Sequence, residues 1–195
     1  MEKEDDSRKW KTLKSDIIVS RPPWLRVRHD EVQLPDGRVN PEFYVLEYPD
    51  WVNVIAITDD GHMVMEMQYR YGLGETCVEI CAGVIEEGET PEQAARRELE
   101  EETGYTGGVW EKWMTISGNP STTNNLTHCF IARGVKPSGK RHLDATEDLD
   151  VRLMTEEEVF TLLAGDNVRQ SLMAAPLWKY FATKGCMPVS LWRER

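Results

Sequence analysis

The stretch GVIEEGETPEQAARRELEEETGY, residues 83 to 105, decides the fold of this 195-residue chain. A loop leads into a predicted helix at Thr90, a threonine N-cap followed by Pro91 at the first helical position. Gln93 stands where a capping box places Glu or Gln, and Gly104 is expected to end the helix. The stretch therefore predicts a loop, a helix and a second turn.

Acidic residues crowd the end of this predicted helix. Glu98 and Glu102 are four residues apart and Glu101 is three from Glu98, so their carboxylates share one face. Like charges at these spacings cost a few tenths of a kcal/mol each, and they also face the negative end of the helix dipole. Mg²⁺ prefers carboxylate oxygens, so the pattern indicates a cation on that face. The other acidic residues of the stretch fit a solvated face: Glu86, Glu87 and Glu92.

The spacing of the whole stretch is G-x5-E-x7-R-E-L-x-E-E-x-G-Y, which resembles the signature of the Nudix hydrolases. The one departure is Tyr105, where that family has an aliphatic residue. The resemblance implies an α/β/α Nudix sandwich with a mixed sheet. It implies Mg²⁺, with Mn²⁺ as a substitute, held by Glu98, Glu101, Glu102 and Ala82. It also implies catalytic roles for Glu101, and for Arg97 and Glu89 as residues that orient the cluster.

The resemblance extends beyond this box to the ADP-sugar pyrophosphatase branch, and above all to ADP-ribose pyrophosphatases. The segments that carry it are the N-terminal strands, YPDWV at 48–52, QYR at 68–70 and EICAG at 79–83. It implies that Arg70 binds a substrate phosphate and that the N-terminal sheet exchanges with a partner subunit in a homodimer. Pro120, fifteen residues after Tyr105, occupies a marker position of the branch, and a plain turn proline is the less favoured alternative.

Two further site residues are candidates. Glu147 lies where the branch often has a glutamate that activates water, but Asp148, Asp144 and a plain acidic loop remain alternatives. Trp51 is a candidate for stacking on the adenine base, and a core tryptophan is the alternative.

The rest of the chain alternates between strand-like and helix-like segments. Strands are predicted at 16–20, 24–32, 42–47, 51–58, 63–69, 109–117, 126–132 and 150–154, and helices from 155 and over 167–183. We expect a small N-terminal antiparallel β subdomain for dimerisation at 1–47, a Nudix catalytic domain at 48–185 and a C-terminal tail at 186–195.

Composition limits the functional classes. The chain is 40% hydrophobic and 29% charged, like an ordinary globular protein, and it has no apolar segment of the ~20 residues that span a membrane. A net charge of -11 argues against binding to nucleic acid. The charged N-terminus lacks an apolar signal stretch, so a cytoplasmic protein is expected, with its four cysteines as free thiols.

We therefore expect Mg²⁺-dependent hydrolysis of the pyrophosphate bond of a nucleoside diphosphate sugar. ADP-ribose, giving AMP and ribose 5-phosphate, is the favoured substrate. The alternatives are GDP-mannose, a dinucleotide or a nucleoside triphosphate on the same fold, because specificity lies in loops. A non-catalytic nucleotide-sugar sensor is less favoured, since the metal carboxylates are intact.

Overall fold

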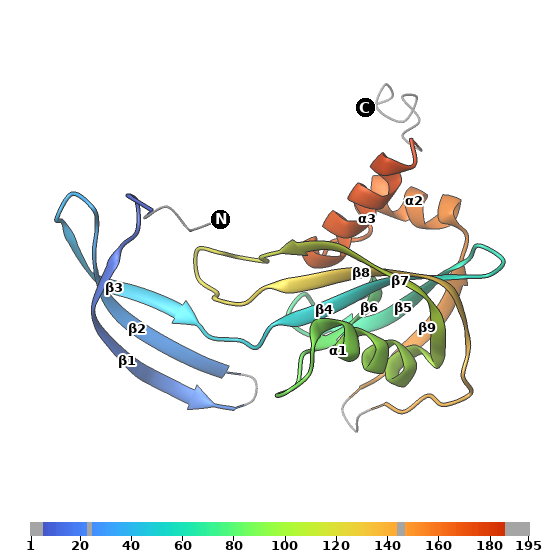
Figure 1. Cartoon of the computed structure of the whole chain (residues 1–195), viewed down its shortest axis with the longest axis horizontal. Helices are drawn as coiled ribbons and strands as arrows, with labels where there is room; N and C mark the ends of the chain where they lie inside the picture. Colours follow the sequence, from blue (N-terminus) through green and yellow to red (C-terminus); the bar gives the residue numbers. More distant parts are fainter. Residues whose placement is uncertain (1–5, 23–24, 144–146, 186–195) are drawn as a thin grey trace. The chain divides into compact units, whose positions relative to one another are not determined.

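A computed structural model of the chain describes residues 6–22, 25–143 and 147–185. The chain forms two compact units (Figure 1). One consists of Met1–Pro49 with Asn119–Asn125, and the other of Asp50–Gly118 with Leu126–Arg195. Asp144 and the tail at 186–195 lie outside the described residues.

The N-terminal unit is a three-stranded antiparallel sheet in the order β1-β2-β3. Its strands are β1 (Lys11–Arg21), β2 (Leu25–Gln33) and β3 (Val39–Leu46). The loop Asn119–Asn125 belongs to the same unit, and the Leu46 N–H donates to the Thr122 carbonyl at 2.7 Å. The predicted antiparallel sheet is confirmed, with β1 longer than the predicted run.

A six-stranded mixed sheet in the order β7-β8-β4-β6-β5-β9 forms the centre of the second unit. Strands β4 and β8 pair in parallel, while the other neighbours are antiparallel. The strands are β4 (Trp51–Thr58), β5 (Met63–Arg70), β6 (Glu75–Val84), β7 (Tyr105–Ile116), β8 (Thr127–Pro137) and β9 (Leu149–Met154).

Helices cover both faces of this sheet (Figure 1). On β4, Val54 and Ala56 pack toward α1 (Pro91–Glu98), while Ile55 and Ile57 pack on the other face. Alternate residues of a strand point to opposite faces, so one apolar strand serves two cores. Helices α2 (Glu156–Ala164) and α3 (Ser171–Thr183) cover that second face. The predicted α/β/α sandwich is confirmed.

Local signals located the helix starts. Thr90 and Thr155 are both N-caps, and each forms a complete capping box with Gln93 and Glu158. Strand β6 was not predicted, and two features of the helices also differ from the sequence prediction. Helix α3 begins at Ser171 rather than near 167, and the box helix changes after Glu98 into a π-helix, η1 (Leu99–Thr103), before Gly104 ends it in a left-handed conformation.

No helix among the described residues is both long and apolar enough to cross a membrane. Cys77, Cys81 and Cys129 are buried free thiols, as the sequence predicted for the cysteines within the described ranges.

Candidate active site

Arg97 is the centre of the hydrogen-bond network on the box helix. Its guanidinium donates to both Glu89 oxygens at 2.9 Å, to Glu98 Oε1 at 2.8 Å and to Glu101 Oε2 at 3.1 Å. A fifth bond goes to the Val84 carbonyl at 3.0 Å, so every N–H of the guanidinium has an acceptor. These partners raise the pKa of Arg97, with the Glu89 bonds as the largest cause. The side chain therefore ties the loop before the helix to the helix carboxylates.

Gly83 leaves room for the Glu98 carboxylate. A Cβ atom at position 83 would lie 2.1 Å from Glu98 Cδ and 2.2 Å from its Oε1. A side chain at position 83 would force the Glu98 carboxylate to move, so this close approach, and not the backbone angle, favours the first glycine of the box. Strand β6 and helix α1 are thereby positioned against each other through a carboxylate.

Two carboxylates of the cluster are buried. Glu98 and Glu102 are 9% and 6% exposed. Burial, followed by the nearby Glu98 charge, raises the pKa of Glu102 to about 8, and burial likewise raises the pKa of Glu98. The Ala82 N–H donates to Glu102 Oε2 at 3.3 Å. Such a buried, like-charged pair needs protons or a cation to offset its repulsion.

A loop after β8 holds the C-terminal end of the box helix. Arg141 Nε donates to the Glu102 carbonyl at 2.6 Å, and Arg141 also donates to the Leu149 carbonyl. The N–H of His142 donates to the Glu101 carbonyl at 2.9 Å. Glu147, shortly before β9, is half-buried, and its charge contributes to raising the pKa of both Glu98 and Glu102. Glu147 is therefore within electrostatic range of the buried pair.

A family model for the NUDIX domain matches residues 47–175, and one for the nucleoside diphosphate sugar hydrolase N-terminal domain matches residues 10–46. The chain belongs to the Nudix family. It is a Nudix pyrophosphohydrolase.

Relatives of this Nudix hydrolase include an ADP-ribose pyrophosphatase of Bacillus subtilis (strain 168), which is 37% identical over 71% of this chain and 75% of the relative. A methanol dehydrogenase activator of Bacillus methanolicus is 34% identical over 83% of this chain and 86% of the relative. The crystal structure of an ADP compounds hydrolase superposes with a TM-score of 0.79, at 20% identity, over 94% of this chain and 100% of the other. At that identity the last match establishes the fold.

The structure places the other candidate residues of the Nudix hydrolase as follows. Arg70, at the end of β5, forms a bidentate pair with the buried Glu79, and its side chain is 39% exposed. Trp51, the first residue of β4, is half-buried, and its indole Nε1 has no acceptor among the described residues. Pro120 lies in an exposed turn of the N-terminal unit.

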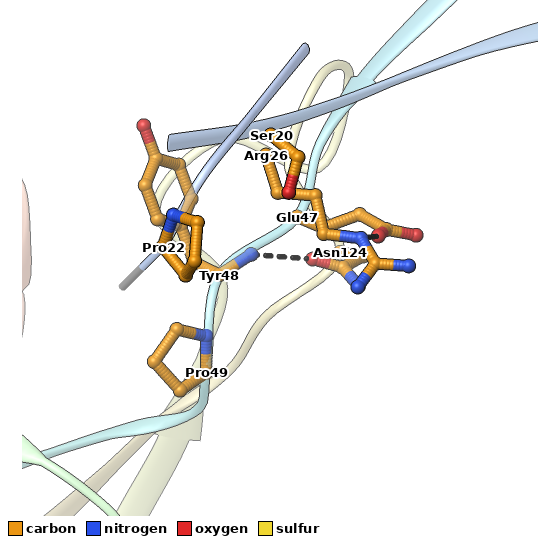
Figure 2. A pocket seen from close by; sticks show the side chains of 7 residues that line it. All are labelled: Ser20, Pro22, Arg26, Glu47, Tyr48, Pro49 and Asn124. Atoms are coloured by element: carbon orange, nitrogen blue, oxygen red, sulfur yellow. Dashed lines mark hydrogen bonds and ion pairs between the residues drawn. The ribbon is translucent and has the colours of Figure 1, made fainter. Parts of the chain in front are cut away.

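The loop that contains Pro120 also borders a pocket in the N-terminal unit. The pocket has a volume of about 480 Å³ (Figure 2). Within it, Asn124 Oδ1 accepts from the Tyr48 N–H at 3.1 Å, and Arg26 pairs with Glu47 at 2.7 Å. Its lining residues are Ser20, Pro22, Arg26, Glu47, Tyr48, Pro49 and Asn124.

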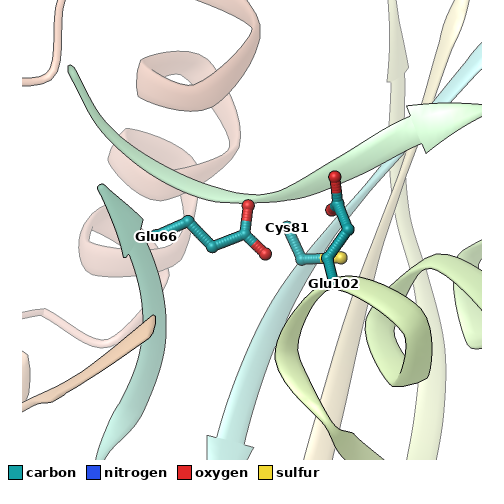
Figure 3. Close-up of side chains that lie close together, drawn as sticks. All are labelled: Glu66, Cys81 and Glu102. Atoms are coloured by element: carbon teal, nitrogen blue, oxygen red, sulfur yellow. The ribbon is translucent and has the colours of Figure 1, made fainter. Parts of the chain in front are cut away.

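Sequence reasoning missed three residues at this site: Glu66, Cys81 and Arg141. Glu66 is 2% exposed and Cys81 is fully buried, and both face the box helix next to Glu102 (Figure 3). In a strand, residues two apart share a face, so Glu66 lies on the same face as the apolar Val64. A charged residue on that apolar face was the sequence signal for Glu66. Arg141 had no sequence signal, because its partners are backbone carbonyls.

Proposed function

We propose that this Nudix hydrolase cleaves the pyrophosphate bond of a nucleoside diphosphate sugar, with ADP-ribose as the preferred substrate. Water adds across the P–O–P linkage, so ADP-ribose and water give AMP and ribose 5-phosphate. The observation that carries the proposal is the buried Glu98–Glu102 pair, anchored through Arg97 and accommodated by Gly83. The named relative from Bacillus subtilis supports the choice of an ADP-linked substrate.

The residues fit a divalent cation of the Mg²⁺ type, with Mn²⁺ as a substitute. Glu98, Glu101, Glu102 and the backbone carbonyl of Ala82 offer only oxygen ligands to it. The pKa of Glu102 is raised first by burial and then by the nearby Glu98 charge, and a bound cation would offset both effects. When bound, the cation would neutralise the diphosphate and polarise its phosphoryl oxygens. Glu89 and Arg97 hold the cluster in place: Arg97 bonds Glu98 and Glu101, and Glu89 fixes Arg97.

Glu147 is the proposed general base, and it would accept a proton from the attacking water. Its charge acts on both buried glutamates, which supports a place at the edge of the same cluster. Arg70 would bind a substrate phosphate with the part of its guanidinium that Glu79 leaves available, and Trp51 would stack on the base. Pro120 would shape the loop that contributes to substrate selection.

A substrate panel tests the proposal. The kcat/KM values for ADP-ribose, ADP-glucose, GDP-mannose, NADH and ATP are measured at fixed Mg²⁺, with products resolved by chromatography. We expect ADP-ribose to be the best substrate by at least about tenfold, equivalent to ~1.4 kcal/mol in transition-state binding. A better GDP-mannose or triphosphate rate would reject the ADP-ribose assignment, whereas binding without turnover of any substrate would favour a sensor.

We also propose a homodimer formed through the N-terminal sheet. Every residue of the edge strand β1 is exposed, including Leu13, Ile17 and Ile18 at 42%, 43% and 52%. An exposed edge strand with apolar side chains is a template for pairing with another chain. Light scattering of the full chain at micromolar concentration is expected to give twice the 22.4 kDa chain mass, and a monomeric mass would contradict the proposal.

A further inference from the structure

Strands β5 and β6 place two glutamates directly opposite each other beneath the box helix. Glu66 on β5 pairs in register with Glu79 on β6. Like charges across a strand pair are destabilising, more so when both side chains are buried, and these two are 2% and 1% exposed. Arg70 donates two hydrogen bonds to Glu79. Glu79 therefore has a counter-ion, and Glu66 does not share those bonds.

Glu66 is instead directed toward Cys81 and Glu102 (Figure 3). One oxygen of each glutamate and the Cys81 sulfur lie within 4.8 Å of one another. Glu66 Oε1 is buried and has no hydrogen-bond partner in the described part of the chain. A buried carboxylate oxygen without a partner is costly, and it is one that a bound ion would satisfy.

We propose that Glu66, Cys81 and Glu102 form a second cation site, selective for a thiophilic divalent ion such as Zn²⁺ or Co²⁺. Thiolate sulfur is a preferred ligand of these ions, whereas Mg²⁺ takes oxygen. The proposed site therefore differs from the box site, whose ligands are all oxygens, because it includes a sulfur ligand. The two sites share Glu102. The binding itself does not depend on the proposed hydrolysis.

The dimensions fit after a small adjustment. With Zn–O of ~2.1 Å and Zn–S of ~2.3 Å, tetrahedral ligand atoms lie about 3.4–3.6 Å apart. The cluster must contract by roughly one ångström from its upper limit of 4.8 Å, which rotations of the two glutamate side chains provide. Binding displaces the thiol proton of Cys81 to solvent.

Sharing Glu102 has a consequence for the Mg²⁺ site, and this consequence rests on the proposed function. A Zn²⁺ ion that takes Glu102 removes one carboxylate from the box cluster. The two cations therefore compete, and excess Mg²⁺ is expected to weaken binding of the thiophilic ion. Competition through a shared ligand is a reciprocal effect, so Zn²⁺ weakens Mg²⁺ binding by the same factor.

Cobalt spectroscopy on the full chain tests the site. Protein stripped with a chelator is titrated with Co²⁺, and thiolate-to-cobalt charge-transfer absorption is followed in the near ultraviolet. We expect this band in the wild-type protein, its loss in Cys81→Ser, and its displacement by Zn²⁺. Cys77→Ser is the matched control, because Cys77 is also a buried free thiol on β6 and lies outside the three-residue cluster. That variant is expected to keep the band.

Glu66→Gln is the second variant, which guards against misfolding in Cys81→Ser. It preserves the side-chain shape and is expected to bind Co²⁺ at least about tenfold more weakly while keeping wild-type circular dichroism. Absence of a charge-transfer band in the wild type, its persistence in Cys81→Ser, or its loss in Cys77→Ser would overturn the proposal. A band without Mg²⁺-dependent hydrolysis would leave this site standing and reject the proposed function instead.

Discussion

The two faces of the six-stranded sheet bury different chemistry. Under α2 and α3 the buried cluster is apolar, with Met65, Ile80 and Leu177 at 0–1% exposure. Under α1 the same strands bury Glu66 and Glu79, and the helix adds Glu98 and Glu102. Apolar burial stabilises at about 25 cal/mol per Å², whereas each buried carboxylate carries a desolvation cost. Both faces therefore gain stability from apolar burial, because Val54, Ala95 and Phe130 also pack on the α1 side, but the buried carboxylates of this sheet lie on the α1 face.

The difference between the two faces arises from neighbouring residues of one strand, which point to opposite faces of the sheet. On β5, Met65 faces α2 and α3 while Glu66 faces α1. On β6, Ile80 faces α2 and α3 while Cys81 faces α1. One substitution can therefore perturb one face with little effect on the other, which makes the comparison testable.

The largest effect is expected from Glu102→Gln on the charged face. Loss of this proposed metal ligand should lower kcat/KM by about 10²–10³-fold or more, comparable to removal of a main electrostatic group. The unfolding free energy should stay equal or rise, because a buried like charge is removed while the amide oxygen can still accept from Ala82. Enzyme assays and urea denaturation measure the two quantities.

Glu100→Gln is the matched control for that variant, since it makes the same change in the same π-helix at a half-buried position. Its kcat/KM should remain within about threefold of wild type, as expected for surface changes of under ~0.5 kcal/mol. Equal losses in both variants would mean that net charge, and not the Glu102 position, controls activity.

The opposite face is probed by Leu177→Ala. Leu177 is a fully buried residue of α3, and truncating its side chain creates a cavity. The unfolding free energy should therefore fall by about 2–5 kcal/mol. The kcat should be unchanged at temperatures where the variant is folded, because the charged face keeps its contacts. A marked loss of kcat in fully folded protein would show that the two faces are coupled.

Gly83→Ala tests the contact that joins strand β6 to the charged face. The added Cβ would overlap the Glu98 carboxylate, which must move and lose its bond to Arg97. We expect kcat/KM to fall by ~10–100-fold, the scale for displaced metal ligands and their supports. Gly72→Ala is the control, since nothing lies within 4 Å of its Cβ position and its φ is not positive. Wild-type activity of Gly83→Ala would reject the steric explanation.

Local patterns in the sequence predicted much of this structure. The capping boxes at Thr90 and Thr155 depend on residues three apart, so they are readable without the fold. Strand β4 was predicted with its observed bounds because it is almost wholly apolar. Strand β6 was missed, since its buried Glu79 and small residues break the apolar alternation on which strand prediction relies.

Other features depend on tertiary contacts that spacing alone cannot encode. The box sequence predicted the shared face of Glu98 and Glu102, but not the change to a π-helix after Glu98. Glu66 and Cys81 meet Glu102 only because β5 and β6 pair in one register and α1 crosses above them. Arg141 acts through carbonyls of two distant segments, which leave no trace in residue identity.

The pH dependence of stability also separates the two faces. Burial raises the pKa of Glu102 to about 8 in the folded protein, from 4.5 as its ordinary value, and the pKa values of Glu98 and Glu66 move in the same direction. Between these pH values the folded state holds a proton that the unfolded state has released. The resulting stabilisation is therefore complete below pH ~4.5 and is lost as pH rises toward ~8, by up to about 1.4 kcal/mol per pH unit. Urea denaturation in a chelator at pH 5, 6, 7 and 8 should show this decline, with a smaller slope in Glu102→Gln and an unchanged slope in Leu177→Ala. A stability that is flat or rises over this range in metal-free wild-type protein would mean that the buried carboxylates are neutralised by neighbouring cations such as Arg97 and Arg141, and not by protons.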